Sequence, residues 1–270
     1  MNRLAALLGA DRPVLLDGGM GTLLQDSGLE DGAPGELWNL ENPDAVRAAH
    51  AAYAEAGARL LTTNTFGGTR PRLDMHGLGD RLGEVNRTAA QLARSVAEER
   101  GLLVAGDLGP TGELLAPLGT MTREEAQALF AEQLMALVEG GIDLVLVETL
   151  SDLGEADAAL AAAREVAPGL PVAVTMSFDT NVRTMMGVRP GDAVCTWQRQ
   201  VPTPWAPTAV AVRTRWRSSL RRWCAPAPAT QWRTWPRQVP TPWAPTAVVV
   251  PRRWRSSPRR WCRLAPATCS

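Results

Sequence analysis

Small and polar residues directly follow five short apolar runs in the first part of this sequence. They are Asp17, Gly18 and Gly19 after the first run, Asn64 and Thr65 after the second, Gly106 and Asp107 after the third, Glu148 and Thr149 after the fourth, and Ser177 after the fifth. Carboxylates, amides and hydroxyls can bind a polar ligand if the fold brings them together. Each position also has an ordinary structural explanation, because Asp-Gly-Gly often forms a tight turn and Glu148 could be an anion at a helix N-terminus. Taken together, the five positions favour one shared site.

The apolar runs alternate with helical patterns, which predicts a parallel α/β fold. We expect strands at residues 13–16, 59–63, 102–105, 144–147 and 172–176. We expect helices at 43–56, 82–100 and 151–166, and a further helix after Thr122, which forms a capping-box pattern with Glu125. A barrel and an open doubly wound sheet both fit this alternation. Five consecutive strand ends with site-like residues favour an incomplete (β/α)8 TIM-type barrel of about five βα units, because an open sheet concentrates its site near one switch point.

The motifs at these strand ends resemble those of the homocysteine S-methyltransferase family. The matching stretches are residues 15–22 (Leu-Leu-Asp-Gly-Gly-Met-Gly-Thr), 63–67 (Thr-Asn-Thr-Phe-Gly), 106–112 (Gly-Asp-Leu-Gly-Pro-Thr-Gly), 147–149 (Val-Glu-Thr), 176–180 and 183–188. Their order and spacing run through residues 1–194 and then stop. Within this family, the set of motifs is most similar to that of the homocysteine-binding module of cobalamin-dependent methionine synthases.

The resemblance implies a (β/α)8 barrel that transfers a methyl group to the thiol of homocysteine and so forms methionine. It implies that Asp17 and Glu148 lie near the substrate ammonium group, with Gly18, Gly19 and Asn64-Thr65 completing the substrate-binding site. It also implies a zinc ion held by three cysteines, one in a Gly-x-Asn-Cys segment and two in a Cys-Cys pair. Zinc would deprotonate the thiol, whose ordinary pKa is about 8.5. The methyl donor stays open between methyl-cobalamin, betaine and S-methylmethionine. A cobalamin donor would have to arrive on a separate module.

The composition divides the chain near residue 194. All 28 acidic residues and all 24 glycines precede residue 195, whereas half of the 28 arginines, nine of the 10 tryptophans and all 4 cysteines lie at or after residue 195. One globular domain does not usually divide its composition in this way. We therefore expect a partial barrel at 1–194 and a poorly ordered Arg/Pro/Trp-rich tail at 195–270. No apolar run reaches the roughly 18 residues of a membrane span, so we expect a cytoplasmic protein with no membrane partner.

The tail consists of two 38-residue repeats, in which residues 200–210 recur as 238–248. Two units are too few for a solenoid. If the codons of residues 201–210 are read one nucleotide earlier, they permit Gly-Ala-Asp-Ala-Val-Gly-Ala-Asn-Cys-Gly, which contains the Gly-x-Asn-Cys segment expected there. We interpret the tail as a frameshifted translation whose cysteines, at 195, 224, 262 and 269, are incidental.

On this interpretation the family's zinc ligands are missing, so we predict no metal site and no catalysis by the chain as written. One alternative is a genuine Arg/Trp-rich tail that binds nucleic acid through its charge of about +14 and its aromatic rings. Another is a different class of barrel enzyme that uses the loops for phosphate binding. The usual late-strand phosphate loops are missing, which makes this second alternative weaker. We therefore expect homocysteine, and not nucleic acid, as the ligand.

Overall fold

The structure is a computed structural model of the whole chain, and it describes residues 14–178, 182–193, 196, 209–214 and 247–248. Strands β1 (Val14–Leu15), β2 (Leu60–Thr62), β3 (Leu103–Leu108), β4 (Leu144–Leu150) and β5 (Val172–Phe178) lie where the apolar runs predicted them. Two further strands, β6 (Ala209–Thr214) and β7 (Ala247–Val248), fall within the tail.

The four long helices also match the prediction. They are α4 (Pro43–Glu55), α6 (Leu82–Arg100), α7 (Arg123–Gly140) and α8 (Leu153–Val166). The capping box of α7 is present, since the Glu125 amide donates to Thr122 Oγ1 over 3.1 Å and the Thr122 amide donates to Glu125 Oε2 over 2.7 Å. The sequence did not predict three short helices, α2 (Met20–Asp26), α3 (Trp38–Glu41) and α5 (Arg70–Asp74). These helices have two turns or fewer, which is too short to show a helical period.

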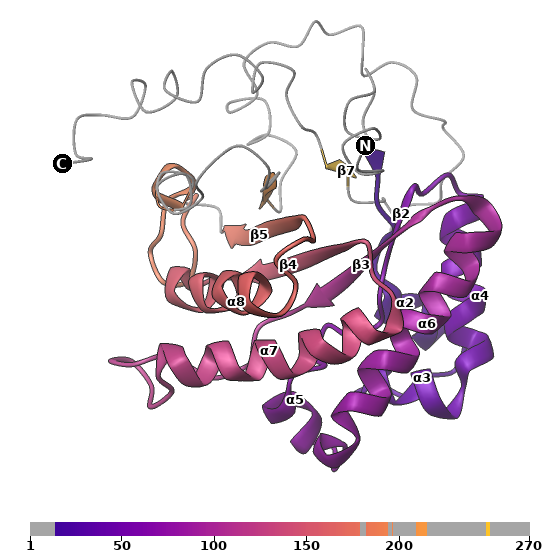
Figure 1. Cartoon of the computed structure of the whole chain (residues 1–270), viewed down its shortest axis with the longest axis horizontal. Coiled ribbons are helices and arrows are strands. Elements are labelled where there is room, and N and C mark those ends of the chain that lie inside the picture. Colours follow the sequence, from indigo (N-terminus) through magenta and orange to yellow (C-terminus); the bar gives the residue numbers. More distant parts are fainter. Residues whose placement is uncertain (1–13, 179–181, 194–195, 197–208, 215–246, 249–270) are drawn as a thin grey trace, which may run out of the picture.

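The main sheet is parallel and follows the order β2-β3-β4-β5-β6, which is also the order of the strands along the chain. A parallel bridge between Leu16 and Leu60 places the end of β1 beside β2. Figure 1 shows α6, α7 and α8 along one side of this sheet. A doubly wound sheet reverses its strand order at a switch point, whereas a barrel keeps it sequential. The sequential order therefore excludes the doubly wound alternative for these strands. The described strands do not close into a complete barrel.

Strand β6 lies within the tail, for which the sequence predicts poor order. It pairs in parallel with β5 from Ala173 opposite Ala209 to Phe178 opposite Thr214. The alternating Ala and Val residues of this segment favour a strand, and the outer edge of β5 offers unpaired backbone groups. β7 pairs antiparallel with β1. The rest of the tail lies outside the described residues, so its predicted disorder stays a prediction.

Both faces of the sheet are buried. Val104, Val145 and Val147 point into the large core between the sheet and the helices. On the opposite face, alternate residues of the same strands form a second cluster, which comprises Leu16, Leu60, Leu103, Ala105, Leu144 and Leu146. Burial on both faces explains why these strands read as continuous apolar runs. No helix in the described part of the chain combines the length and the apolar character of a membrane span.

Candidate functional site

The candidate site lies at the carboxyl ends of β1 to β4. Because these strands are parallel, their carboxyl ends meet at one edge of the sheet, where barrel enzymes place their active sites. Three acidic residues gather there: Asp17 after β1, Asp107 in β3 and Glu148 in β4. We call these three residues the carboxylate cluster.

Asp17 is almost completely buried, with 4% of its surface exposed. The Thr62 amide donates to Asp17 Oδ2 and the Thr62 hydroxyl donates to Asp17 Oδ1, each over 2.6 Å. Burial raises the pKa of Asp17 to about 7. The two Thr62 hydrogen bonds oppose this rise, and the charge of Glu148 adds to it. The structure thus brings Asp17 and Glu148 within electrostatic range, as the sequence analysis expected of two residues at one sheet edge.

Asp107 belongs to the cluster. It was one of the polar residues expected at a strand end, but the family resemblance implied a role for Asp17 and Glu148 only among the acidic residues. Its amide donates to Thr63 Oγ1 over 2.9 Å, and its carbonyl accepts from Thr65 Oγ1 over 2.9 Å and from Gln133 Nε2 over 3.2 Å. Its side chain is 2% exposed, and its Oδ1 atom has no hydrogen-bond partner among the described residues. Burial raises the pKa of Asp107 well above its usual value, with further contributions from the charges of Glu148, Asp17 and Glu36 and from a hydrogen bond with Glu148.

A β-bulge near the end of β4 positions Glu148. The register between β4 and β5 shifts between Val147 and Leu150, and Thr149 adopts a positive φ of 64°. The Thr149 amide donates to Thr175 Oγ1 over 3.0 Å, which fixes this conformation. Positive φ is uncommon for a residue other than glycine and is often found at functional sites.

Glu148 is not an anion of the first turn of a helix. Helix α8 begins at Leu153, and its N-cap is Asp152, whose Oδ1 accepts from the Gly154 amide over 2.6 Å. Glu148 instead lies within the final part of β4. This excludes the helix-terminus explanation for that residue.

Gly18 and Gly19 lie against Tyr53. A Cβ atom on Gly18 would lie 2.9 Å from the Tyr53 hydroxyl, so a larger residue would displace the tyrosine ring. The Tyr53 hydroxyl donates to the Gly19 carbonyl over 3.1 Å. Burial, together with the nearby Asp17 charge, raises the pKa of Tyr53 to about 12. The absence of a side chain at Gly18 therefore allows Tyr53 to pack beside Asp17, and the contact of Gly18 and Gly19 with a substrate stays a prediction.

Asn64 and Thr65 are buried and bonded to other parts of the protein. Asn64 Nδ2 donates to the Gly35 carbonyl over 2.7 Å and to Asn39 Oδ1 over 3.0 Å. Thr65 Oγ1 bonds to Thr63 Oγ1 over 2.7 Å and donates to the Asp107 carbonyl. These side chains hold the loops after β2 and the backbone of β3. Thr65 thus contacts the main chain of a cluster residue, and the role of Asn64 and Thr65 in substrate binding stays a prediction.

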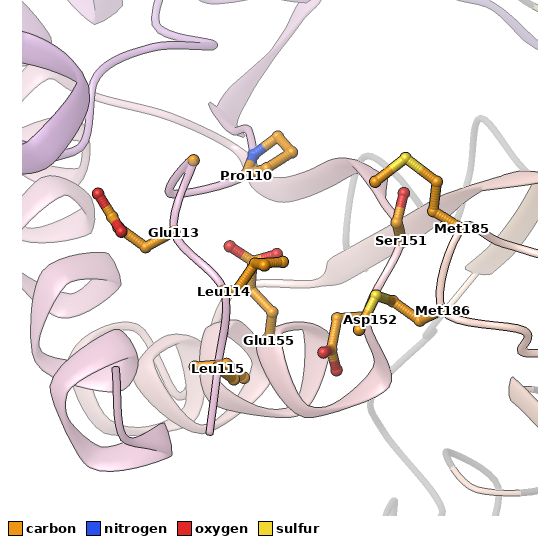
Figure 2. A pocket seen from close by; sticks show the side chains of 10 residues that line it. Pro110, Glu113, Leu114, Leu115, Ser151, Asp152, Glu155, Met185 and Met186 are labelled. Carbon is orange, nitrogen blue, oxygen red and sulfur yellow. The ribbon is translucent and has the colours of Figure 1, made fainter. Parts of the chain in front are cut away.

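A cavity of about 220 Å³ opens between the loops that follow β3, β4 and β5 (Figure 2). Its lining includes the apolar side chains of Leu114, Leu115, Met185 and Met186. Glu155 lies at its base, where its Oε1 accepts from the Thr111 amide over 2.8 Å and from the Thr111 hydroxyl over 2.7 Å. Figure 2 shows Asp152 and Glu155 side by side at the start of α8. The cavity borders the same edge of the sheet as the carboxylate cluster.

The described residues do not fit a zinc–thiolate site. They contain no cysteine, and they contain no group of three His, Cys, Asp or Glu side chains arranged to hold a metal ion. His50 is buried within α4, and His76 follows α5. Cys195, Cys224, Cys262 and Cys269 all lie outside the described residues.

A parallel α/β sheet with sequential strand order is an arrangement of the TIM-barrel type, in which active sites lie at the carboxyl ends of the strands. The sequence model of the homocysteine S-methyltransferase family matches residues 14–213. The chain therefore belongs to the homocysteine S-methyltransferase family. The match continues beyond residue 194, where the sequence motifs stopped, and reaches into β6.

Two methionine synthases are similar to the chain over 200 residues. The protein from Mycobacterium leprae (strain TN) is 33% identical and that from Mycobacterium tuberculosis (strain ATCC 25618 / H37Rv) is 32% identical, each over 68% of this chain. The aligned region makes up only 16% and 17% of these two proteins, so the chain spans about a sixth of their length.

Solved structures of the homocysteine methyltransferase MmuM from Escherichia coli share the fold. The metallated form is 27% identical with a TM-score of 0.65, and the match covers 78% of this chain and 77% of that chain. The apo form is 26% identical with a TM-score of 0.62, and the match covers 78% and 75% of the two chains.

Proposed function

We propose that residues 14–193 form the amino-acid-binding part of a methyltransferase that acts on the thiol of homocysteine and yields methionine. The observation that carries this proposal is the carboxylate cluster at the carboxyl edge of the sheet, in a chain of this family. Asp17 is buried beside the charge of Glu148. The described groups that act on the pKa of Asp17 include no cationic side chain, which would lower that pKa. An ammonium group bound there would supply the missing positive charge, so Asp17 and Glu148 are suited to bind the ammonium group of an amino acid.

We further propose that the chain as written does not catalyse the transfer. A free thiol is mostly protonated at neutral pH, and the carboxylate cluster can hold an ammonium group but cannot activate sulfur. The family resemblance assigns that activation to zinc held by three cysteines, and residues 14–193 supply none of them. The substrate-binding half of the site would thus be present without the half that activates the thiol.

A shift in reading frame accounts for the missing cysteines. The one-nucleotide shift that permits Gly-x-Asn-Cys continues to give a plausible sequence: the codons of residues 211–219 then permit Gly-Gly-Pro-Asp-Ala-Val-Glu-Val-Val. This segment restores the glycine and acidic residues that the written tail lacks, and Asp before Ala-Val-Glu suits a helix start. The family match, which reaches residue 213, supports a further barrel unit in this part of the chain.

The methyl donor belongs to other parts of a larger protein or to a separate one. The chain corresponds to about a sixth of the methionine synthases that it matches, which leaves room in such proteins for other modules. We propose that the donor is presented by such a module.

The test compares the purified chain with a frame-restored version. We expect the written chain to bind no stoichiometric zinc and to show negligible homocysteine methylation, whereas the frame-restored version gains both. A frame-restored version with serine in place of the cysteine of Gly-x-Asn-Cys is the matched control, and we expect it to lose zinc and turnover. One equivalent of tightly bound zinc together with full turnover in the written chain would contradict the proposal.

The competing function is nucleic-acid binding by the Arg/Trp-rich tail, and it is tested separately on the coding DNA. Its motivation is the excess of arginine over acidic residues after residue 194. Sequencing the coding DNA and translating it in both reading frames distinguishes the two explanations. A continuous alternative frame rich in Gly, Asp and Glu supports the frameshift, and a stop codon early in that frame supports the tail.

A further inference from the structure

The side chain of Asp107 lies on the face of the sheet that is turned away from the helices. Successive residues of β3 alternate between the two faces, as in any strand. Ala105 belongs to the cluster on the face away from the helices, and Val104 belongs to the core beneath them. Gly106 also faces the helices, because a Cβ atom there would lie 2.7 Å from the Ile142 side chain. Asp107 therefore shares the face of Ala105, which we call the inner face.

The strand register places Asp107 between the other two members of the carboxylate cluster. Thr62, whose amide and hydroxyl both donate to Asp17, pairs with the residue two positions before Asp107 in β3. On its other side, Asp107 pairs with the residue two positions before Glu148 in β4. Residues two positions apart on a strand share a face. The three carboxyl groups thus come from neighbouring strands and meet on the inner face at its carboxyl edge.

Asp107 is held by its main chain, which leaves its side chain without a full set of partners. Its amide donates to Thr63 Oγ1, and its carbonyl accepts from Thr65 Oγ1 and from Gln133 Nε2. Gln133 is completely buried, so this support is rigid. The Asp107 side chain is 2% exposed, and its Oδ1 atom has no hydrogen-bond partner in the described part of the chain. A buried acceptor without a donor is costly, and in a rigid site it marks the place of a donor that a ligand brings.

We propose that Asp107 binds the ammonium group of the amino-acid substrate directly, with its Oδ1 atom accepting one of the three N–H donors of that group. This inference rests on the proposed function and adds a third ligand to Asp17 and Glu148. An ammonium group has three donors and no acceptor, so carboxyl groups from three strands can each accept one hydrogen bond. Such a site rejects an acid that lacks the amino group, because the buried oxygens would then stay unpaired.

Stability without a ligand separates this role from a structural one. Asp107→Asn keeps the shape of the side chain, and Oδ1 has no donor to lose, so we expect the urea midpoint of the full chain to stay the same or rise. Thr63→Val is the contrasting variant, because it removes the hydroxyl that accepts from the Asp107 amide, and it should lower the midpoint. A fall in Asp107→Asn as large as that in Thr63→Val would assign Asp107 a structural role and overturn the proposal.

Calorimetry at pH 7 then compares homocysteine with 4-sulfanylbutanoic acid, which has the same carbon chain and thiol but no amino group. We expect Asp107→Asn to weaken homocysteine binding by about tenfold and Asp107→Ala to weaken it at least as much. Neither variant should weaken binding of the amine-free acid. As a control, Asp143→Asn changes a carboxylate bonded to Arg94 over 2.9 Å outside the cluster, and it should leave both affinities unchanged.

Two results would count against the proposal in different ways. If the parent chain binds homocysteine and both Asp107 variants bind it equally well, or if they lose affinity equally for the two acids, the role of Asp107 is overturned and the proposed function stands. If the parent chain binds no homocysteine, the proposed function fails and the role of Asp107 fails with it.

Discussion

Replacing Asp17 with asparagine removes a buried charge while preserving its hydrogen bonds. In the parent chain both oxygens of Asp17 accept from Thr62, one from the amide and one from the hydroxyl. In Asp17→Asn the side-chain oxygen can accept from the amide of Thr62. The new NH2 group can donate to the Thr62 hydroxyl, which is able to accept. The substitution therefore changes the charge of the site with little change in its packing.

The size of the effect follows from the pKa of Asp17, which burial raises from 3.8 to about 7. Between these two values the folded chain keeps a proton that the unfolded chain has released. The free energy of unfolding of the parent therefore falls as pH rises through this window. The full difference is about 4 kcal/mol, because each pH unit corresponds to 1.36 kcal/mol. This contribution is favourable below pH 3.8, and it is lost once the pH exceeds about 7.

Urea unfolding at pH 5, 7 and 9 provides the measurement. We expect Asp17→Asn to gain stability relative to the parent as pH rises, with most of the gain complete by pH 9. Part of the gain will come from Asp107, whose pKa the Asp17 charge also raises. The control is Asp44→Asn, which changes a carboxylate that is 88% exposed and should leave the pH dependence unchanged. If the stability difference between Asp17→Asn and the parent stays constant from pH 5 to pH 9, burial does not raise the pKa of Asp17 in the folded chain.

Two further substitutions test the packing and a helix cap. His50 is fully buried, both of its ring nitrogens lack partners among the described residues, and burial lowers its pKa from 6.5 to about 4. The folded chain therefore loses about 3 kcal/mol relative to the unfolded chain as pH falls from 6.5 to 4. His50→Leu should remove that loss in acid unfolding curves, and an unchanged acid limb would contradict this expectation. Thr122→Ala removes the hydroxyl that accepts from the Glu125 amide at the start of α7 and should cost about 1 kcal/mol in urea unfolding. Thr122→Ser, which keeps the hydroxyl, should cost much less, and equal costs would show that the cap is not responsible.

The sequence determined the four long helices and strands β1 to β5, because their signals are local. Continuous apolar runs predicted β3 and β4, since both faces of these strands are buried. The Thr122 pattern predicted the start of α7, and Gly101 and Gly141 end α6 and α7 with positive φ. Parallel α/β alternation also placed Asp17 and Glu148 at the same edge of the sheet. The family followed from the order of the motifs.

Only the tertiary structure decided which groups surround each residue of the candidate site. Contacts between strands far apart in the sequence bring Asp107 against Glu148, and no local pattern reports such a contact. The same contacts bind Asn64 and Thr65 to neighbouring loops, whereas the sequence presented them only as polar residues after a strand. The bulge at Thr149 depends on the pairing of β4 with β5 and on the Thr175 hydroxyl. Charge and hydrogen bonding in a buried site depend on the neighbours that surround each group, and the fold alone sets those neighbours.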